Sequence, residues 1–271
     1  MGVISTLKNI LRETRCAADV AADARSWLQL SLDAVLFRAL KLTTFGLRNQ
    51  ERTVRLRDGI RITYRLNRGD IQGMREIWYD QVYRLPFEGT TNSIVDLGAN
   101  IGLTSIYLSK RYGAHTIVAV EPDRDNLRLI RRNFAQNGIA GQIIDAAIGA
   151  SDGKVRFAAD NDSNLGRVSE QGREVDMISM KTLMERANLE HIDVLKMDIE
   201  GGEGPLLAGP TPWLSQVHGI IAEFHPDRID YPLCVSQIER AGLRLVPPGS
   251  IYRKTTDCFV SERVQTHVPE R

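Results

Sequence analysis

The sequence has almost no excess of charge of either sign. Its 271 residues include 35 Lys and Arg against 34 Asp and Glu, which leaves a formal net charge of +1. Proteins that bind nucleic acid or anionic membranes through a broad electrostatic field carry a clear basic excess. We therefore expect neither nucleic acid nor a charged membrane surface to be a partner of this chain.

Cysteine is scarce and long apolar runs are absent. The three cysteines, Cys16, Cys234 and Cys258, are odd in number and far apart, so we expect neither a disulfide framework nor a zinc site. This cysteine usage fits a reducing compartment, and we therefore expect a cytoplasmic location. Charged residues such as Lys8 and Arg12 interrupt the apolar residues of the N-terminus, which argues against a signal peptide. No stretch of about 20 uncharged apolar residues offers a membrane span.

What the sequence does contain divides it into three zones. Residues 1–50 carry apolar residues at helical spacing and predict a helical extension, with a nearly buried helix from Trp27 to Leu36 and a stop at Gly46. We expect a packing or dimerisation element, because the mixed charges of its polar face weaken the alternative of a membrane-surface helix. Residues 51–88 predict a β-hairpin at Asp58-Gly59, followed by a polar-aromatic connecting segment in which Tyr79, Asp80 and Tyr83 can border a site.

The third zone, residues 89–271, alternates strand and helix patterns, which predicts an α/β fold with a doubly wound, mostly parallel sheet. The expected strands lie at 93–98, 115–122, 141–149, 192–198 and 218–224, followed by an antiparallel pair near 243–254 and 257–263. Ligands of such sheets bind outside the carboxyl ends of the strands. We therefore expect the chemistry at Asp96–Gly102, Glu121, Asp145, Asp198 and Glu223.

The stretch "VDLGANIG" predicts a nucleotide-binding loop between a strand and a helix. Gly98 and Gly102 allow the backbone to approach a ligand with positive φ. Asn100 tolerates the left-handed conformation, but its side chain would crowd a pyrophosphate. This favours a nucleotide without a pyrophosphate, such as S-adenosylmethionine.

Acidic residues at successive strand ends suit that cofactor. Asp96 can attract its methionine ammonium group, Glu121 can accept from both ribose hydroxyls, and Asp145 can accept from the adenine amino group. The rest of the predicted cofactor-binding set consists of Gly98, Ala99, Asn100, Gly102, Pro122 and Ala146. The alternatives are a helix N-cap for Asp96 and a solvated strand end for Glu121.

A second cluster lies in "DVLKMDIEGGE". Lys196, Asp198 and Glu200 alternate, so an extended chain places them on one face, although a salt-bridge network would use the same residues. Asp198 is the first candidate for positioning the methyl acceptor or for taking its proton. Lys196 is the candidate for stabilising developing oxyanion charge or for keeping Asp198 ionised. Glu200 and His225 complete the catalytic candidates. Asp198, Glu223 and His225 can instead ligate magnesium or manganese, so a divalent metal stays open without being part of the prediction.

The segments "VDLGANIG", "AVEPD", "AAIGASDGKVRF" and "DVLKMDIEGGE" together resemble the FkbM-type family of S-adenosylmethionine-dependent methyltransferases. The resemblance covers about residues 51–263, and the first 48 residues inherit nothing from it. It implies a seven-stranded, Rossmann-like class I methyltransferase sheet and O-methylation of a sugar, glycan or natural-product small molecule. By motif match it also implies that Asp96, Gly98, Asn100, Gly102 and Glu121 bind the cofactor.

Two other functions stay open from the residues: a non-catalytic S-adenosylmethionine-binding scaffold, and a nicotinamide-dependent oxidoreductase, which Asn100 fits poorly. The polar segments 69–87 and 158–174 are expected to shape the acceptor pocket, and their composition suits a sugar better than a flat apolar ring. The apolar stripe of the N-terminal helices is compatible with a homodimer.

Overall fold

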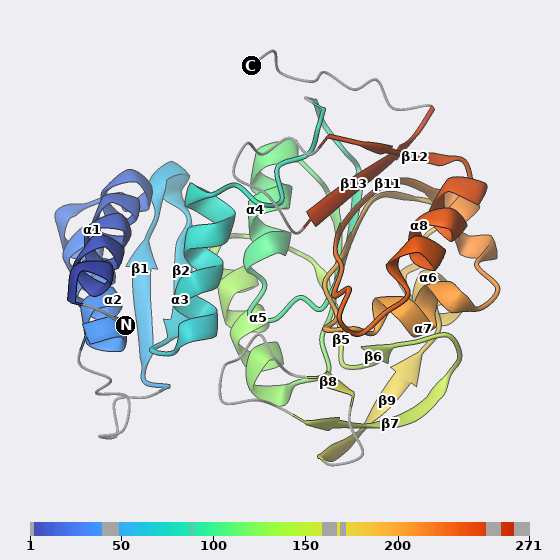
Figure 1. Cartoon of the computed structure of the whole chain (residues 1–271), viewed down its shortest axis with the longest axis horizontal. Helices are drawn as coiled ribbons and strands as arrows, with labels where there is room; N and C mark the ends of the chain where they lie inside the picture. Colours follow the sequence, from blue (N-terminus) through green and yellow to red (C-terminus); the bar gives the residue numbers. More distant parts are fainter. Residues whose placement is uncertain are drawn as a thin grey trace.

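The centre of the molecule is a seven-stranded sheet with the strand order β12-β13-β11-β10-β3-β4-β5 (Figure 1). The computed structural model describes residues 3–39, 49–87, 89–158, 167–168, 172–247 and 256–262. The strands are β3 (Ser93–Leu97), β4 (Thr116–Val120), β5 (Gln142–Ile144), β10 (Ile192–Met197), β11 (Val217–Glu223), β12 (Leu243–Val246) and β13 (Thr256–Ser261). Five neighbouring strands, β11 to β5, are parallel, and β13 is antiparallel to both of its neighbours. The predicted α/β class with a mostly parallel seven-stranded sheet is confirmed.

Helices cover both faces of this sheet. One face packs against α4 (Leu103–Tyr112) and α5 (Arg124–Gln136), and the other against α6 (Met180–Ala187), α7 (Glu203–Ala208), the 3₁₀-helix η4 (Pro212–Gln216) and α8 (Tyr231–Arg240). Every residue of β3 is buried, as expected for a parallel strand covered on both sides. The carboxyl ends of β3, β4, β10 and β11 therefore meet at one edge of the sheet.

The strand predicted over residues 141–149 is wrong in its extent. The chain turns after β5, where the Ala146 N–H donates to the Ile144 carbonyl at 3.1 Å. It then enters a second sheet, of order β6-β9-β7-β8, which the sequence did not predict. This sheet consists of β6 (Ala147–Ile148), β7 (Gly153–Ala158), β8 (Arg167–Val168) and β9 (Arg173–Ile178). Because β6 pairs with β9, which is distant in the sequence, the predicted strand over residues 141–149 is divided between the two sheets.

The predicted hairpin is present as β1 (Glu51–Arg55) and β2 (Arg61–Arg65), with Asp58 in the left-handed region at φ 62°. Asn133 of α5 and Asn137, the residue directly after this helix, connect the hairpin to the sheet domain. Asn133 and Asn137 each accept from one backbone N–H of β2 and donate to one of its carbonyls, at 2.7 to 3.0 Å. After the hairpin come α3 (Arg68–Met74) and a π-helix, η3 (Arg75–Tyr79).

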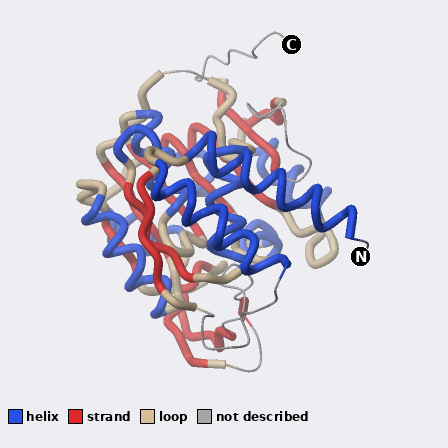
Figure 2. Tube along the Cα trace, turned by 90° about the vertical axis from the view of Figure 1, so that its left-hand side faces the viewer, coloured by secondary structure: helices blue, strands red, loops and turns tan. Residues whose placement is uncertain are grey.

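The N-terminal helices, α1 (Val3–Val20) and α2 (Ala24–Ala39), lie side by side next to the hairpin (Figures 1 and 2). The prediction of a nearly buried helix is wrong for α2, because it packs on one side only. Leu30 and Ala34 are buried, whereas Trp27, Leu28 and Leu32 are 42% to 51% exposed. The predicted stop at Gly46 lies outside the described residues, and the division of the chain after residues 50 and 88 stays a prediction.

One hydrophobic core joins these segments. It contains Cys16 of α1, Val54 and Ile62 of the hairpin, Ile77 of η3 and Ile106 of α4. No helix within the described residues combines the length and apolar character needed to cross a membrane.

Candidate active site

The loop after β3 adopts the backbone that its glycines predict. Gly98, Asn100 and Gly102 have φ of 75°, 50° and 83°, so Asn100 occupies the left-handed region as expected. A Cβ on Gly98 would lie 2.0 Å from the carbonyl oxygen of Asp198. Glycine is therefore required where the loop touches the carboxyl end of β10.

A buried ion pair lies beneath this loop. Lys196 Nζ is 3.0 Å from Asp96 Oδ1 and donates to the carbonyl oxygens of Leu97 (3.2 Å) and Gly98 (2.8 Å). Burial lowers the pKa of the Lys196 ammonium group, but the charges of Asp96 and Asp198 and the hydrogen bond to Asp96 together outweigh it, so the pKa is raised. Asp96 is fully buried and also accepts from the Ser105 hydroxyl at 2.6 Å. The three donors of Lys196 thus point at the loop and at Asp96, and the geometry favours a role in holding the loop.

Glu121 braces the same loop from the end of β4. Its carboxylate accepts from the backbone N–H of Asn100 and of Asp123, each at 2.8 Å. It is 4% exposed, and burial raises its pKa to about 7. Of the two alternatives considered for this residue, a solvated strand end does not fit this burial.

The other predicted cofactor residues lie along the same edge of the sheet. Pro122 follows Glu121, and its carbonyl accepts from Arg173 at 2.7 Å. Asp145 is exposed at the turn after β5, and Ala146 behind it is fully buried. Asp145 is therefore accessible to a ligand without disturbing the core.

The second cluster forms a tight turn rather than a continued strand. The strand β10 ends at Met197, and Glu200 adopts a left-handed φ of 56°. Glu203, fully buried at the start of α7, accepts from the backbone N–H of Ile199 (2.8 Å) and of Gly201 (3.0 Å). The acid at this helix start therefore fixes the shape of the turn that carries Asp198 and Glu200.

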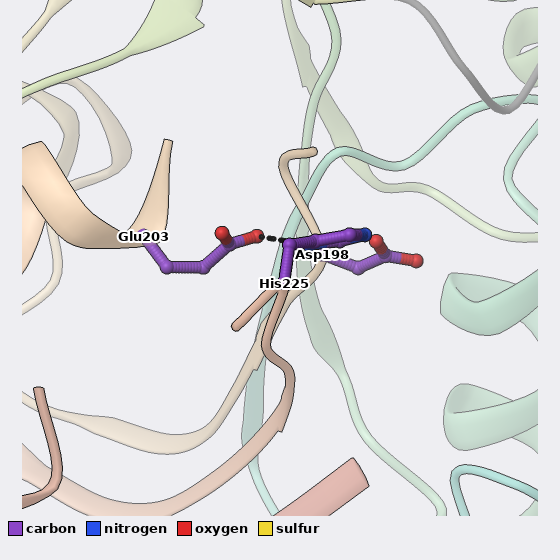
Figure 3. A group of neighbouring side chains, drawn as sticks. All are labelled: Asp198, Glu203 and His225. Carbon is purple, nitrogen blue, oxygen red and sulfur yellow. Dashed lines mark ion pairs between the residues drawn. The ribbon is translucent and has the colours of Figure 1, made fainter. Parts of the chain in front are cut away.

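His225 lies between the acids of this turn, as Figure 3 shows for Glu203 and Asp198. Its Nδ1 is 3.5 Å from Glu203 and its Nε2 is 3.6 Å from Glu200. The Glu203 carboxylate raises the pKa of His225 to about 9. The imidazole is then protonated at neutral pH, which makes it a poor proton acceptor and a good counter-charge for the acids.

A cavity of about 130 Å³ brings the loop and the turn together. Among the predicted site residues it is lined by Gly98, Ala99, Asn100, Lys196, Asp198 and Glu200, together with Glu223. Asp96, Gly102, Glu121, Pro122, Asp145, Ala146 and His225 do not line it. Usual ligand pockets measure roughly 300–1,000 Å³, so this cavity encloses only part of a cofactor and acceptor.

The opposite wall comes from α3, η3 and the segment after them. Gly69, Gln72, Gly73, Glu76, Ile77 and Tyr83 line the cavity there, and Leu103 and Thr104 of α4 do so beside the loop. The Tyr83 hydroxyl donates to Asp198 Oδ2 at 2.9 Å. Of the three residues expected to border the site, only Tyr83 lines the cavity, while Asp80 pairs with Arg12 and Arg75. The spacing 69, 72, 73, 76 is one helix face, a signal that could have identified this wall.

One group of described residues has the spacing needed to hold a metal ion. Ligand atoms of Asp198, Glu203 and His225 lie within 4.8 Å of one another, so Glu203 takes the place that the sequence prediction gave to Glu223. Glu203 already accepts two backbone N–H groups, and a metal would require a deprotonated His225 ring nitrogen. The donor set therefore fits the His225 imidazolium better than a divalent ion.

Comparisons with known proteins identify the family of the chain. The family described as "Methyltransferase FkbM domain" matches residues 96–236. The chain is 24% identical over 213 residues to the 31-O-demethyl-FK506 methyltransferase FkbM of Streptomyces tacrolimicus, covering 64% of this chain and 81% of that protein. It is 28% identical over 169 residues to the hexuronic acid methyltransferase AglP of Haloferax volcanii, covering 57% and 69%.

Solved structures include a similar chain, the methyltransferase FkbM from Methylobacillus flagellatus KT. Its TM-score is 0.48 at 16% identity, and the match covers 95% of this chain and 60% of that one.

Proposed function

The chain belongs to the methyltransferase FkbM domain family of S-adenosylmethionine-dependent methyltransferases, and from this premise we propose that it methylates a hydroxyl oxygen. The acceptor is a sugar, a glycan or a natural-product small molecule. By their names, one relative is a methyltransferase of demethyl-FK506 and another of hexuronic acid. The observation that carries the proposal is Asp198, a carboxylate that faces the cavity directly beside the Gly98 loop.

Cofactor binding is assigned to the carboxyl ends of β3, β4 and β5. The Gly98–Gly102 loop offers close backbone approach, Glu121 holds that loop, and Asp145 is the exposed acid at the far end. Gly98, Ala99 and Asn100 line the cavity, whereas Asp96 supports the loop from below through Lys196. When bound, S-adenosylmethionine supplies the methyl group on a sulfonium.

The residues of the turn are assigned to the acceptor. Asp198 accepts the hydrogen bond of the acceptor hydroxyl and takes its proton as the oxygen is methylated. Tyr83 orients Asp198, and Glu200 lines the same cavity. His225 and Lys196 are positioning residues, since the first balances the charge of Glu203 and Glu200 and the second holds the loop. Precise placement of donor and acceptor is the main contribution an enzyme can make to this in-line transfer.

Calorimetry with S-adenosylhomocysteine, with NAD as the comparison ligand, tests the cofactor. We expect S-adenosylhomocysteine alone to bind, and Asp145→Ala to weaken it about tenfold. Glu190→Ala, which removes an exposed carboxylate near the opposite end of β10, is the control and should bind as the wild type does. Binding of NAD would instead favour an oxidoreductase. Cofactor binding without methyl transfer to any of a broad set of hydroxyl compounds would favour a scaffold.

Two further assignments follow from the described residues. Cys16, Cys234 and Cys258 are buried and none of them forms a disulfide, which supports a reducing compartment such as the cytoplasm. The exposed side chains of Trp27, Leu28 and Leu32 on α2 support a homodimer through the N-terminal helices.

A further inference from the structure

The cavity wall is rich in hydrogen-bond acceptors. Four carboxyl groups line it, those of Glu76, Asp198, Glu200 and Glu223. The Asn100 side-chain oxygen, whose residue also lines the cavity, is buried without a hydrogen-bond partner. The part of a ligand that lies against these carboxyl groups and the Asn100 oxygen must therefore bring hydrogen-bond donors.

The cations near the cavity are already engaged. Lys196, the one cationic side chain among its described lining residues, is directed at Asp96 and two carbonyl groups. Arg228 donates to the carbonyl oxygen (3.1 Å) and the carboxylate (2.8 Å) of Glu200, and His225 lies against Glu203 and Glu200. These contacts balance Glu200 and Glu203, but leave no cation directed at a carboxylate or phosphate of a ligand within the described site.

Glu76 adds negative charge from the acceptor side. It accepts from the Gln72 amide at 2.6 Å, and Arg75 lies 3.6 Å from the same oxygen. Burial is the main cause that raises the pKa of Glu76, and the charge of Asp198 adds to it. Glu76 and Asp198 line the same cavity. The segment that carries Glu76 and Tyr83 precedes residue 96, where the family match begins.

We propose that the acceptor is a hydroxyl-rich compound without a carboxylate or phosphate group, and that Glu76 enforces this choice. The inference rests on the proposed function and narrows it. Carboxylates bind hydroxyl groups well and repel anions at close range in a partly desolvated cavity. The site thus selects neutral sugars or polyols. The relative named hexuronic acid methyltransferase has, by its name, an acidic sugar as its substrate.

Paired sugars that differ only at C6, which is a hydroxymethyl group in one and a carboxylate in the other, test this inference. The protein loaded with S-adenosylhomocysteine is titrated by calorimetry with the methyl glycosides of glucose and galactose, and with the methyl glycosides of glucuronic and galacturonic acids. Transfer of a radiolabelled methyl group to the same compounds gives a second readout. We expect at least one neutral sugar to bind and react, and its uronic acid to bind at least tenfold more weakly.

Glu76→Gln should lower the ratio of the uronic acid's Kd to the neutral sugar's Kd at least threefold, because the amide keeps the hydrogen bond to Gln72 and removes the charge. Glu190→Gln should leave it unchanged. Discrimination by the wild type should also weaken at high salt, which needs no variant. Equal or tighter binding of the uronic acid, or an unchanged ratio in a folded Glu76→Gln, overturns the inference. So does failure of every neutral sugar while S-adenosylhomocysteine binds, an outcome that leaves the cofactor assignment intact.

Discussion

The carboxyl group of Glu121 couples folding to pH. Its pKa rises from 4.5 to about 7 because the side chain is buried at the end of β4. Between these two values the folded chain keeps a proton that the unfolded chain has lost, so stability falls as the pH rises. A shift of this size corresponds to about 3 kcal/mol.

Glu121→Gln should remove this dependence. The amide places a donor against a backbone N–H group where the carboxylate accepted one. This costs the variant stability, but the cost does not arise from a titrating group, so only the wild type changes with pH at this position. The free energy of unfolding of the wild type minus that of the variant should fall by about 3 kcal/mol between pH 4.5 and pH 7. Urea unfolding at several pH values measures it, and a difference that does not vary with pH would show that Glu121 is ionised throughout.

Single residues of the site were predictable where the backbone alone decides their conformation. The glycine spacing and the tolerance of Asn100 for positive φ follow from local sterics, and the structure has both. The partners of Lys196 were not predictable, because an alternating pattern says which residues share a face but not which buried charge lies opposite. The neighbouring strand β3 supplies Asp96 at that position.

The π-helix η3 depends on α1 for its position. Arg75 Nη1 is 2.8 Å from Glu13 of α1, and its Nε is 3.2 Å from Asp80. Arg12 of α1 also reaches Asp80, at 3.2 Å. These ion pairs hold both ends of the segment that places Glu76 and Ile77 at the cavity.

Two arginines on the same aspartate allow a matched test of these ion pairs. The Arg75 side chain is 13% exposed and that of Arg12 is 54% exposed. Arg75→Ala leaves buried Glu13 and Asp80 without this partner and should cost about 3 kcal/mol, whereas Arg12→Ala should cost at most about 1 kcal/mol. Urea unfolding measures both. Arg75→Ala should also raise KM for the acceptor more than Kd for S-adenosylhomocysteine, and equal costs of the two substitutions would contradict this arrangement.

Helices and strands were predictable from the sequence where their apolar residues repeat at a constant spacing. The helices over 103–112 and 180–187 and the strands β3 and β10 lie where apolar periodicity indicates them. Within the run 141–149 only Gln142 and Asp145 are polar, and a single exposed acid does not show that the chain changes sheets there. Its division depends on pairing with β9, about 30 residues away.

The described N-terminal segments share one continuous core with the α4 and α5 side of the sheet. Residues of α1, the hairpin, η3 and α4 share it, although the family match begins only at residue 96. Contacts between segments so far apart in sequence leave no periodic signal, which explains why the N-terminal helices appeared as a separate extension. The described inner side of these helices packs into this core, and described apolar side chains on the outer side of α2 are exposed.

The exposed apolar side chains of α2 predict that the protein forms a homodimer. Leu28 and Leu32 lie one helical turn apart on α2, both 51% exposed, beside Trp27. A second copy of the chain would remove these side chains from water. We expect a dimer by size-exclusion chromatography with light scattering, and a monomer for Leu28→Asp combined with Leu32→Asp, because charges at an apolar interface are costly to desolvate. Leu245→Asp is the control, since this leucine of β12 is also exposed, at 45%, but belongs to the C-terminal strand pair. Wild-type protein that is monomeric at micromolar concentration, or a dimer that only Leu245→Asp disrupts, would show that α2 is not the interface.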